Sequence, residues 1–327
     1  MGIVKEMHLV EDLHNVNSKP TRDGYGEALL ILGETNPKVV VMDADLAKST
    51  RTVWFREKFP EKFIDMGIAE QDMLATAGGL ALGGMIPFCS TYGVFVAGRA
   101  WDQIRTTICY GEFNVKIGGM HGGISVGPDG ATHQSLEEVP LMRVLPGMTV
   151  FSPTDAIEGR KVALFAAEHI GPTYIRYGRE AVPIITTEET PFNPWKAEVY
   201  RTGDDVAIIA AGTLVYEGLL AAEELAKEGI EARVINCHTI KPMDIETIVN
   251  AAKECGAIVT AEEHSIIGGL GGAVAEVICQ HYPVPMRIIG IEDRFGESGE
   301  PEELMKAFGM SAENIIKNVK EVLDMKE

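Results

Sequence analysis

The sequence of 327 residues contains few cysteines and no cysteine pattern that would staple a fold. No CxxC pair and no Cys/His spacing of a metal site is present, so a disulfide-rich or zinc-finger fold is excluded. We expect the scattered cysteines to be small buried hydrophobic residues of a protein in a reducing compartment. They are Cys89, Cys109, Cys237, Cys255 and Cys279.

Positive charge is also scarce. The chain has 29 Lys and Arg residues against 48 Asp and Glu residues, which gives a formal net charge of −19. Such a charge repels nucleic acid and anionic membranes, so an anionic substrate needs a local cluster of Arg and His. No apolar run is long enough to cross a membrane, and the first residues, MGIVKEMHLVEDLHN, lack a signal-peptide core. We therefore expect a cytoplasmic protein that binds neither nucleic acid nor membrane.

Short β-rich runs alternate with helical patterns along the chain, which is typical of parallel sheets covered on both faces. A polar segment with prolines, residues 186–198, interrupts the alternation and predicts a linker. The predicted fold class is therefore α/β with two domains, residues 1–190 and a smaller domain at 200–327. The expected strands are 39–43, 85–89, 114–119, 172–177, 206–210, 231–236, 256–263 and 285–291. The expected helices are 21–35, 69–83, 95–110, 154–168, 214–228, 244–253, 269–280 and 311–325.

An acid, Glu70, stands at the start of a helical pattern rich in Gly and Ala, within DMGIAEQDMLATAGGLALGG (65–84). Most acids in the first turn of a helix complement the helix dipole, and this is the structural interpretation of Glu70. Tyr92 and Phe95 follow in STYGVF (90–95), and on their own they fit two core aromatics.

A glycine-rich loop, HGGISVGPDGATHQ (121–134), carries His121, Asp129 and His133. Its apolar content is too low for a core element, and a long ordered turn does not require two histidines. Ligands collect beyond the carboxyl ends of strands in open parallel sheets, where this loop and the other motifs are expected to lie. The loop therefore predicts a polar binding site.

These motifs together resemble the carboxyl-terminal portion of transketolase over roughly residues 20–320, and the loop has the transketolase form H-x7-D-G-x-T-H-Q. The resemblance implies a pyrimidine-type domain that binds thiamine diphosphate, followed by a smaller transketolase C-terminal α/β domain. It also implies that Glu70 activates the cofactor by sharing a proton with its pyrimidine N1′. Tyr92 and Phe95 would stack on the aminopyrimidine ring, and Asp45 in DADL (43–46) is similar to an acid near the cofactor.

The same resemblance implies a substrate site for sugar phosphates. His121 and His133 would contact ketose hydroxyls or the phosphate, Asp129 would read the configuration at a neighbouring carbon, and all three would take part in catalysis with Glu70. A neutral histidine can both donate and accept a proton, which suits this chemistry. Three further positions match those that hold the sugar phosphate, and an arginine fork suits phosphate oxygens. They are Arg22, Ser49 and Arg179.

One part of a thiamine enzyme is missing from the sequence. These enzymes hold the cofactor's diphosphate through Mg²⁺ on a Gly-Asp-Gly motif followed by a downstream Asn, and no such motif occurs here. We therefore expect no metal on this chain's own residues, with thiamine diphosphate shared with an N-terminal transketolase subunit and Mg²⁺ bound by that subunit. The implied activity is transfer of a two-carbon ketol unit between sugar phosphates of pentose phosphate metabolism, by an α2β2 assembly in which this chain alone is inactive.

Other interpretations remain open. Gln71 in GIAEQ stands where many transketolases carry His, which slightly favours deoxyxylulose phosphate synthase or the beta subunit of a 2-oxoacid dehydrogenase. His121 argues against the former, and the GPDGATHQ loop argues against the latter. A regulatory or scaffolding subunit without catalysis is a third alternative. We expect His238 and His264 to serve structure or the domain interface.

Overall fold

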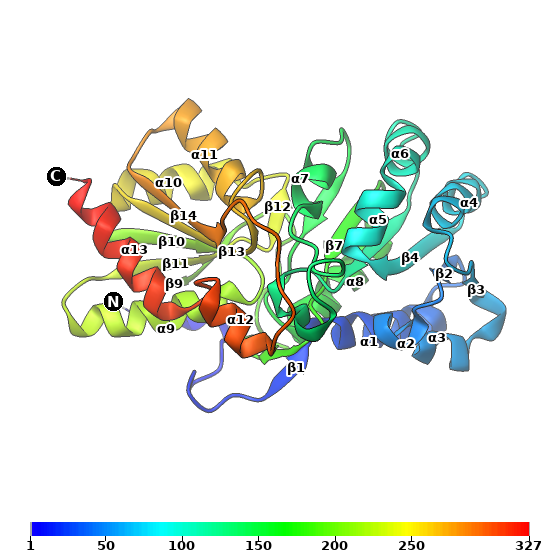
Figure 1. Ribbon diagram of the computed structural model, residues 1–327, viewed down its shortest axis with the longest axis horizontal. Coiled ribbons are helices and arrows are strands. Elements are labelled where there is room, and N and C mark those ends of the chain that lie inside the picture. Colours follow the sequence, from blue (N-terminus) through cyan, green and yellow to red (C-terminus); the bar gives the residue numbers. More distant parts are fainter. Residues whose placement is uncertain (1, 327) are drawn as a thin grey trace.

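Two sheets, one in each half of the chain, lie side by side in the computed structural model, which describes residues 2–326 (Figure 1). The first sheet has seven strands in the order β12-β6-β7-β5-β4-β2-β3. All its pairs are parallel except that of β12 with β6. Its strands are β2 (Val39–Asp43), β3 (Phe63–Asp65), β4 (Ile86–Tyr92), β5 (Lys116–Met120), β6 (Thr149–Phe151), β7 (Thr173–Arg176) and β12 (Thr239–Lys241).

Helices cover both faces of this sheet. Successive residues of its strands point to opposite faces, and those on each face are apolar. Val41 and Phe88 pack against α1, α3 and α8, whereas Met42 and Cys89 pack against α4, α5 and α7. Helices α1 and α8 approach so closely that a Cβ on Gly24 would lie 1.9 Å from the carbonyl oxygen of Ala156. The helices of this unit are α1 (Thr21–Thr35), α2 (Ala47–Thr50), α3 (Thr52–Lys58), α4 (Glu70–Leu82), α5 (Gly93–Arg99), α6 (Trp101–Gln103), α7 (Glu138–Arg143) and α8 (Ala156–Glu168). A separate antiparallel pair joins β1 (Ser18–Pro20) to β8 (Ala181–Pro183).

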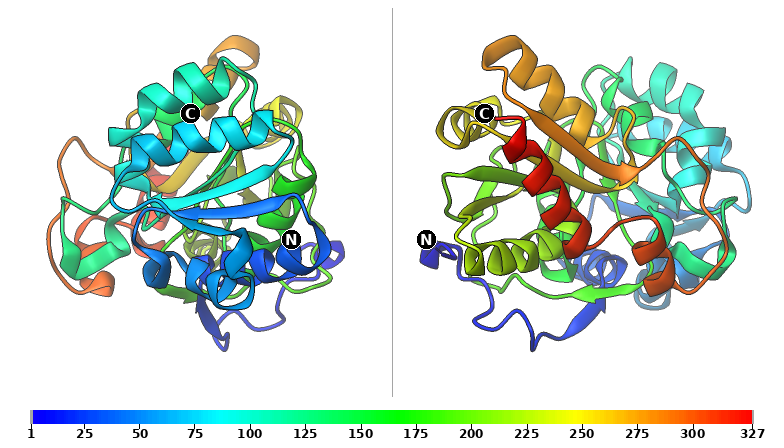
Figure 2. Two further views of the ribbon diagram at one scale, coloured as in Figure 1. Left: turned by 90° about the vertical axis from the view of Figure 1, so that its right-hand side faces the viewer. Right: turned by 60° about the vertical axis from the view of Figure 1, so that its left-hand side comes forward.

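The second sheet has five strands in the order β14-β13-β10-β11-β9, with β9 antiparallel at one edge. Helices α9 and α13 pack together on one face, and α10 and α11 pack on the other (Figures 1 and 2). Its strands are β9 (Glu198–Arg201), β10 (Val206–Ala210), β11 (Ala232–Asn236), β13 (Ile258–Ser265) and β14 (Met286–Ile291). Its helices are α9 (Leu214–Lys227), α10 (Ile245–Cys255), α11 (Leu270–His281), α12 (Pro301–Ala307) and α13 (Ala312–Asp324).

The predicted α/β class is confirmed, and each long predicted strand and helix has a counterpart within a few residues. The helix predicted at 95–110 differs, because it begins at Gly93, is interrupted at Ala100 and continues as a π-helical stretch, Ile104–Cys109. Short elements such as β3, β6 and β12 were not predicted, since three residues carry too little periodicity. Strand β12 joins the first sheet although it follows β11 of the second in sequence.

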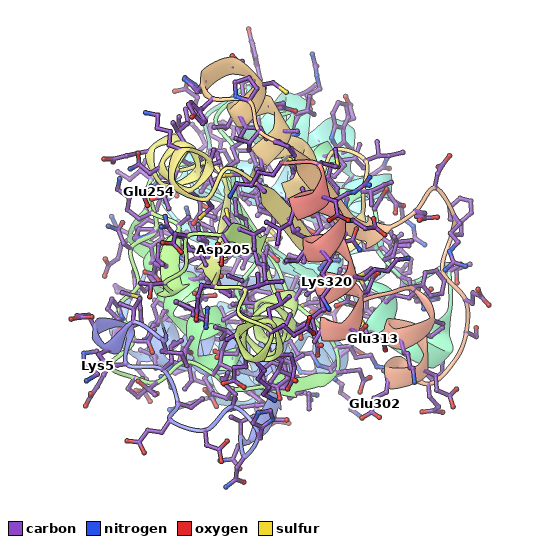
Figure 3. The ribbon with its side chains drawn as sticks, turned by 90° about the vertical axis from the view of Figure 1, so that its left-hand side faces the viewer. Lys5, Asp205, Glu254, Glu302, Glu313 and Lys320 are labelled. Carbon is purple, nitrogen blue, oxygen red and sulfur yellow. The ribbon has the colours of Figure 1, made fainter. Side chains whose placement is uncertain are left out.

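The cysteine prediction is wrong at one position. All five cysteines are free, and four are buried as expected, but Cys279 is exposed because it lies off the apolar stripe of α11. Charged side chains project from the outer side of the second unit, among them Glu254, Glu302 and Lys320 (Figure 3). No helix within residues 2–326 combines the length and hydrophobicity that a membrane crossing needs.

Candidate active site

The predicted site residues follow neighbouring strands of the first sheet. Strands β2, β4, β5 and β7 are parallel neighbours, with Asp43 opposite Ser90 and Tyr92 opposite Met120. Their carboxyl ends therefore share one edge of the sheet. Asp45, Phe95, His121 and Arg179 come shortly after these strand ends, so one edge carries groups far apart in sequence.

Four rings gather at this edge. Tyr92 and Phe95 are stacked, with ring centroids 5.5 Å apart and an interplanar angle of 17°. The His121 ring lies 4.0 Å from that of Tyr92, and the His133 ring meets Phe95 edge-on at 5.4 Å. The structure thus brings together the aromatic pair and both loop histidines, which the sequence placed in two separate motifs.

His121 is buried, with 2% of its surface exposed, and has a left-handed backbone (φ 59°) just after β5. Nη1 of Arg22 lies 2.8 Å from its Nε2, and because a guanidinium only donates, Nε2 must accept. The proton of the neutral ring therefore sits on Nδ1, which is buried and has no partner. Burial, followed by the charges of Arg22 and Arg179, lowers the pKa of His121 to about 2, so the ring is neutral at physiological pH.

Arg22 lies in the first turn of α1 and connects two predicted groups. Its Nη1 also donates to the carbonyl oxygen of Ser49 at 2.7 Å, whereas its buried Nε has no partner. Burial lowers the pKa of Arg22 to about 10, which leaves it charged at neutral pH. The Nδ1–H of His121 and the Nε–H of Arg22 are thus two buried donors without an acceptor, an arrangement that suits an oxygen-rich ligand.

Asp129 and Arg179, both predicted to bind substrate, lie close to each other. Nη1 of Arg179 is 3.3 Å from Oδ1 of Asp129 and donates to the carbonyl oxygen of Val126 at 2.7 Å. Both side chains are about one-third exposed, so the ion pair is weak and can open for a ligand. Asp45 is exposed with φ 63° and lines, with Ser49 and Arg56, a hollow of about 240 Å³.

Glu70 begins α4 and is 4% exposed, which is unusual for an acid without a buried partner. Its partner is Arg99, whose Nη1 donates to Oε1 of Glu70 at 2.9 Å and whose guanidinium lies 4.0 Å from the ring centroid of Phe95. The Arg99 side chain is 49% exposed, so it lies at the surface and separates Glu70 from solvent. Gln71 donates to the carbonyl oxygen of Arg99 at 3.0 Å.

Sequence reasoning missed Arg99. The available signal was its position four residues after Phe95, which places both on one helical face. Arg99 covers one face of the Phe95 ring, so a planar ligand can use that face only after Arg99 moves. The ring cluster beside a buried acid otherwise suits an aminopyrimidine, and half-exposed Arg99 has the freedom to move.

The loop at 121–134 is held by the second unit, which sequence reasoning also missed. Oε1 of Glu263 accepts from the backbone N–H of Ser125 at 2.6 Å, and Nε2 of Gln134 donates to the carbonyl oxygen of Glu297 at 2.8 Å. Glycine is required at Gly123, which has φ 98°, because an added Cβ would lie 2.1 Å from Oε1 of Glu263. The second domain therefore fixes the shape of the loop that carries His121 and His133.

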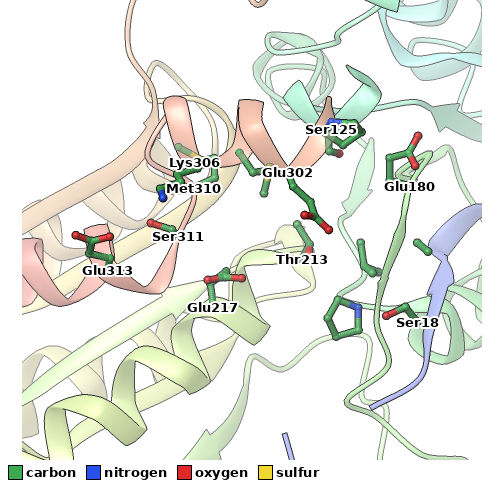
Figure 4. A pocket seen from close by; sticks show the side chains of 15 residues that line it. Ser18, Ser125, Glu180, Thr213, Glu217, Glu302, Lys306, Met310, Ser311 and Glu313 are labelled. Carbon is green, nitrogen blue, oxygen red and sulfur yellow. The ribbon is translucent and has the colours of Figure 1, made fainter. Parts of the chain in front are cut away.

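A larger hollow, of about 470 Å³, lies between β8 and the helices α12 and α13 (Figure 4). Glu180, Glu217, Glu302 and Glu313 line it with a single cation, Lys306, so its charge is unsuited to a phosphate. None of the predicted site residues lines this hollow. We therefore place the candidate site at the sheet edge and not in this cavity.

Comparison with known proteins shows which family the chain belongs to. The transketolase pyrimidine-binding domain family matches residues 17–184, and the transketolase C-terminal domain family matches residues 195–315. The chain is 45% identical over 306 residues to a putative transketolase C-terminal section of Methanocaldococcus jannaschii, covering 93% of this chain and 96% of the relative. It is 42% identical over 305 residues to the 6-deoxy-6-sulfo-D-fructose transketolase subunit SqwH of a Clostridium species, covering 93% and 95%.

A solved structure of a split-gene transketolase, an inactive β4 tetramer, superposes with a TM-score of 0.88 at 48% identity, covering 94% of this chain and 99% of that one. The chain thus belongs to the transketolase family, and it corresponds to the section made of the pyrimidine-binding and C-terminal domains. The resemblance inferred from the motifs is confirmed. A pyrimidine-binding domain of this family implies thiamine diphosphate as the cofactor.

Proposed function

We propose that this chain is the C-terminal subunit of a two-subunit, thiamine diphosphate-dependent transketolase, which moves a two-carbon ketol unit from a ketose phosphate to an aldose phosphate. The observation that carries the proposal is the juxtaposition of a buried acid, a stacked aromatic pair and two buried unpaired donors at one sheet edge. The similar proteins support a transketolase subunit, and two of them are named for different sugars, 6-deoxy-6-sulfo-D-fructose and apulose 4-phosphate. Pentose phosphates are our own choice of substrate, taken from the motif resemblance.

Each residue has a distinct role in this proposal. Glu70 exchanges a proton with the pyrimidine of thiamine diphosphate, which supplies the carbanion chemistry when bound. Tyr92 and Phe95 offer a flat surface for that ring, and Asp45 contributes negative charge at the neighbouring strand end. Arg99 must leave Glu70 and Phe95 for the ring to enter, because it now contacts both.

At the substrate end, His121 donates from Nδ1 to a sugar oxygen, and Arg22 keeps that tautomer in place through Nε2. His133 can exchange a proton with a hydroxyl or carbonyl, and Asp129 accepts from a hydroxyl once its pair with Arg179 opens. Arg179, Arg22 and the loop at Ser49 bind the phosphate. The residues act together only when the substrate lies across the edge formed by β2, β4, β5 and β7.

The diphosphate end of the cofactor requires a partner. Within residues 2–326, one group of three acidic and histidine side chains can hold a metal ion. It consists of Glu158, Glu198 and His238, and it does not belong to the candidate site. We infer that an N-terminal subunit binds Mg²⁺ and the diphosphate, in an α2β2 assembly. The solved β4 tetramer of a split-gene transketolase is described as inactive, which supports a need for the second subunit.

Reconstitution tests this function. The chain is mixed with its candidate N-terminal subunit, thiamine diphosphate and Mg²⁺, and ketol transfer from xylulose 5-phosphate to ribose 5-phosphate is compared with pyruvate-dependent condensation. We expect ketol transfer, and parallel reactions with 6-deoxy-6-sulfofructose as donor identify the preferred sugar. Activity with pyruvate alone would favour deoxyxylulose phosphate synthase or an oxoacid dehydrogenase and overturn the proposal.

A further inference from the structure

A second cluster of chemically active side chains lies where the two units meet. It consists of Glu158 in the first turn of α8, Glu198 at the start of β9, and His238 just after β11. All three are buried, with exposed fractions of 3%, 7% and 0%, and one ligand atom from each lies within 4.8 Å of the others. Helix α8 covers the first sheet and β9 is the edge of the second, so the cluster joins the two domains.

The fold brings these residues together through strand register. Glu198 lies directly opposite Asn236 in the antiparallel pair of β9 and β11, and His238 is two residues beyond Asn236. His238 lies beyond the end of β11 at Asn236, and a ligand atom of its ring lies within 4.8 Å of one from Glu198. Nδ2 of Asn236 donates to Oε1 of Glu158 at 2.7 Å, which adds the α8 carboxylate to the group.

The hydrogen bonds of His238 define its tautomer. The hydroxyl of Thr239 donates its only proton to the carbonyl oxygen of Pro194 at 2.8 Å. Its oxygen must therefore accept from Nδ1 of His238, which lies 2.8 Å away. Nε2 then carries a lone pair, is buried and has no partner.

Two side-chain oxygens of Glu198 and Asn236 also have no donor. They are Oε2 of Glu198 and Oδ1 of Asn236, both buried. No hydrogen bond joins Lys161 to either oxygen, and its ammonium donates instead to the carbonyl oxygens of Thr187 and Thr190 at 2.9 and 2.6 Å. Buried acceptors without donors are costly, and a buried carboxylate needs a counter-charge.

We propose that Glu158, Glu198 and His238, with the side-chain oxygen of Asn236, bind one divalent metal ion that ties the two domains together. An imidazole nitrogen combined with carboxylate and amide oxygens suits Zn²⁺, and also Mn²⁺, better than Mg²⁺ or Ca²⁺. The ion gives the lone pair of Nε2 and the two unpaired oxygens a shared positive partner. Sequence reasoning did not find the site because its ligands lie on three distant elements, without a short spacing motif.

Metal titration of the full chain tests the proposal. Tag-free protein, without partner subunit or thiamine diphosphate, is stripped with EDTA and titrated with ZnCl2 in a calorimeter. We expect one Zn²⁺ per chain and a rise in Tm on binding. Glu198→Gln keeps the size of the side chain and should weaken Zn²⁺ binding at least tenfold, whereas Glu61→Gln, at an exposed turn outside the cluster, should bind as the unaltered chain does.

X-ray absorption on the Zn²⁺-loaded unaltered chain gives a second measurement that needs no variant. We expect nitrogen and oxygen neighbours only, including one imidazole. Unchanged binding by Glu198→Gln would indicate an adventitious ion only and overturn the proposal. Sulfur neighbours would place the ion on a cysteine, and no binding of Zn²⁺ or Mn²⁺ would show that protons occupy the cluster; either result also overturns it.

Discussion

The two ends of the candidate site differ in how they are supported. At the substrate end, His121 is buried and the loop that follows it is fixed by Glu263 and Glu297 of the second domain. At the cofactor end, Glu70 is covered by the half-exposed side chain of Arg99. The proposed substrate end is therefore held in place by both domains of this chain, whereas at the proposed cofactor end only a half-exposed arginine separates Glu70 from solvent.

An exposed apolar residue lies beside the proposed cofactor end. Ile68, two residues before Glu70, is 76% exposed. Large apolar side chains at the surface are common at protein interfaces. The difference between the two ends thus agrees with a site that a partner subunit completes from the Glu70 side.

Removing the acid should have the largest effect. In the reconstituted enzyme, Glu70→Gln should lower kcat by roughly 10²- to 10⁴-fold, because the proton exchange of general acid–base catalysis is lost. Turnover at saturating substrate measures this. Asp72→Asn, also in the first turn of α4 but exposed, serves as the control and should stay near normal. A loss below tenfold for Glu70→Gln would support the interpretation as a non-catalytic subunit.

Altering the substrate end should affect sugar binding and leave cofactor binding intact. His121→Gln should lower kcat/KM about 10- to 100-fold, the range for losing a hydrogen bond in a charged setting. Steady-state kinetics with the ketose phosphate measures the loss, and titration with thiamine diphosphate supplies the contrast. A weaker cofactor affinity with normal sugar kinetics would reverse the assignment of the two ends.

The burial of His121 also predicts a pH dependence of stability. Its folded pKa, about 2, lies below the ordinary value of 6.5, so below pH 6.5 the unfolded chain binds a proton that the folded chain does not. Its contribution to stability is complete above pH 6.5 and falls by about 1.4 kcal/mol for each pH unit below it. The free energy of unfolding of the isolated chain is measured with urea at pH 5, 6 and 7. It should fall less steeply with decreasing pH in His121→Gln than in the unaltered chain. Equal slopes would mean that the ring is protonated in the folded chain.

The smallest effect is expected at Arg99. An ion pair with a half-exposed arginine stabilises a protein by about 0–1 kcal/mol, so Arg99→Ala should change the free energy of unfolding little. If Arg99 leaves Glu70 when the cofactor enters, kcat of the reconstituted enzyme should fall less than tenfold. Arg105→Ala, another exposed arginine, is the matched control. A loss as large as that of Glu70→Gln would make Arg99 part of the catalytic group.

The sequence predicted those parts of the fold and site that depend on local patterns. Strand β2 begins with four consecutive apolar residues, 39–42, and the loop from His121 to His133 has an unusual composition, so both could be recognised. The ion pair of Arg99 with Glu70 spans 29 positions and the hydrogen bond of Glu263 with Ser125 spans 138, so no local pattern predicts either contact. Strand β12 was missed for a related reason. It follows β11 of the second sheet in sequence, but it pairs with β6 of the first sheet.

Stepwise reconstitution shows whether a partner subunit completes the proposed cofactor end. Ketol transfer is measured while the N-terminal subunit is added to a fixed amount of this chain with thiamine diphosphate and Mg²⁺ present. We expect no transfer by this chain alone and a rise to a plateau at equal amounts of the two subunits. Ketol transfer by the isolated chain at the rate of the mixture would contradict this expectation.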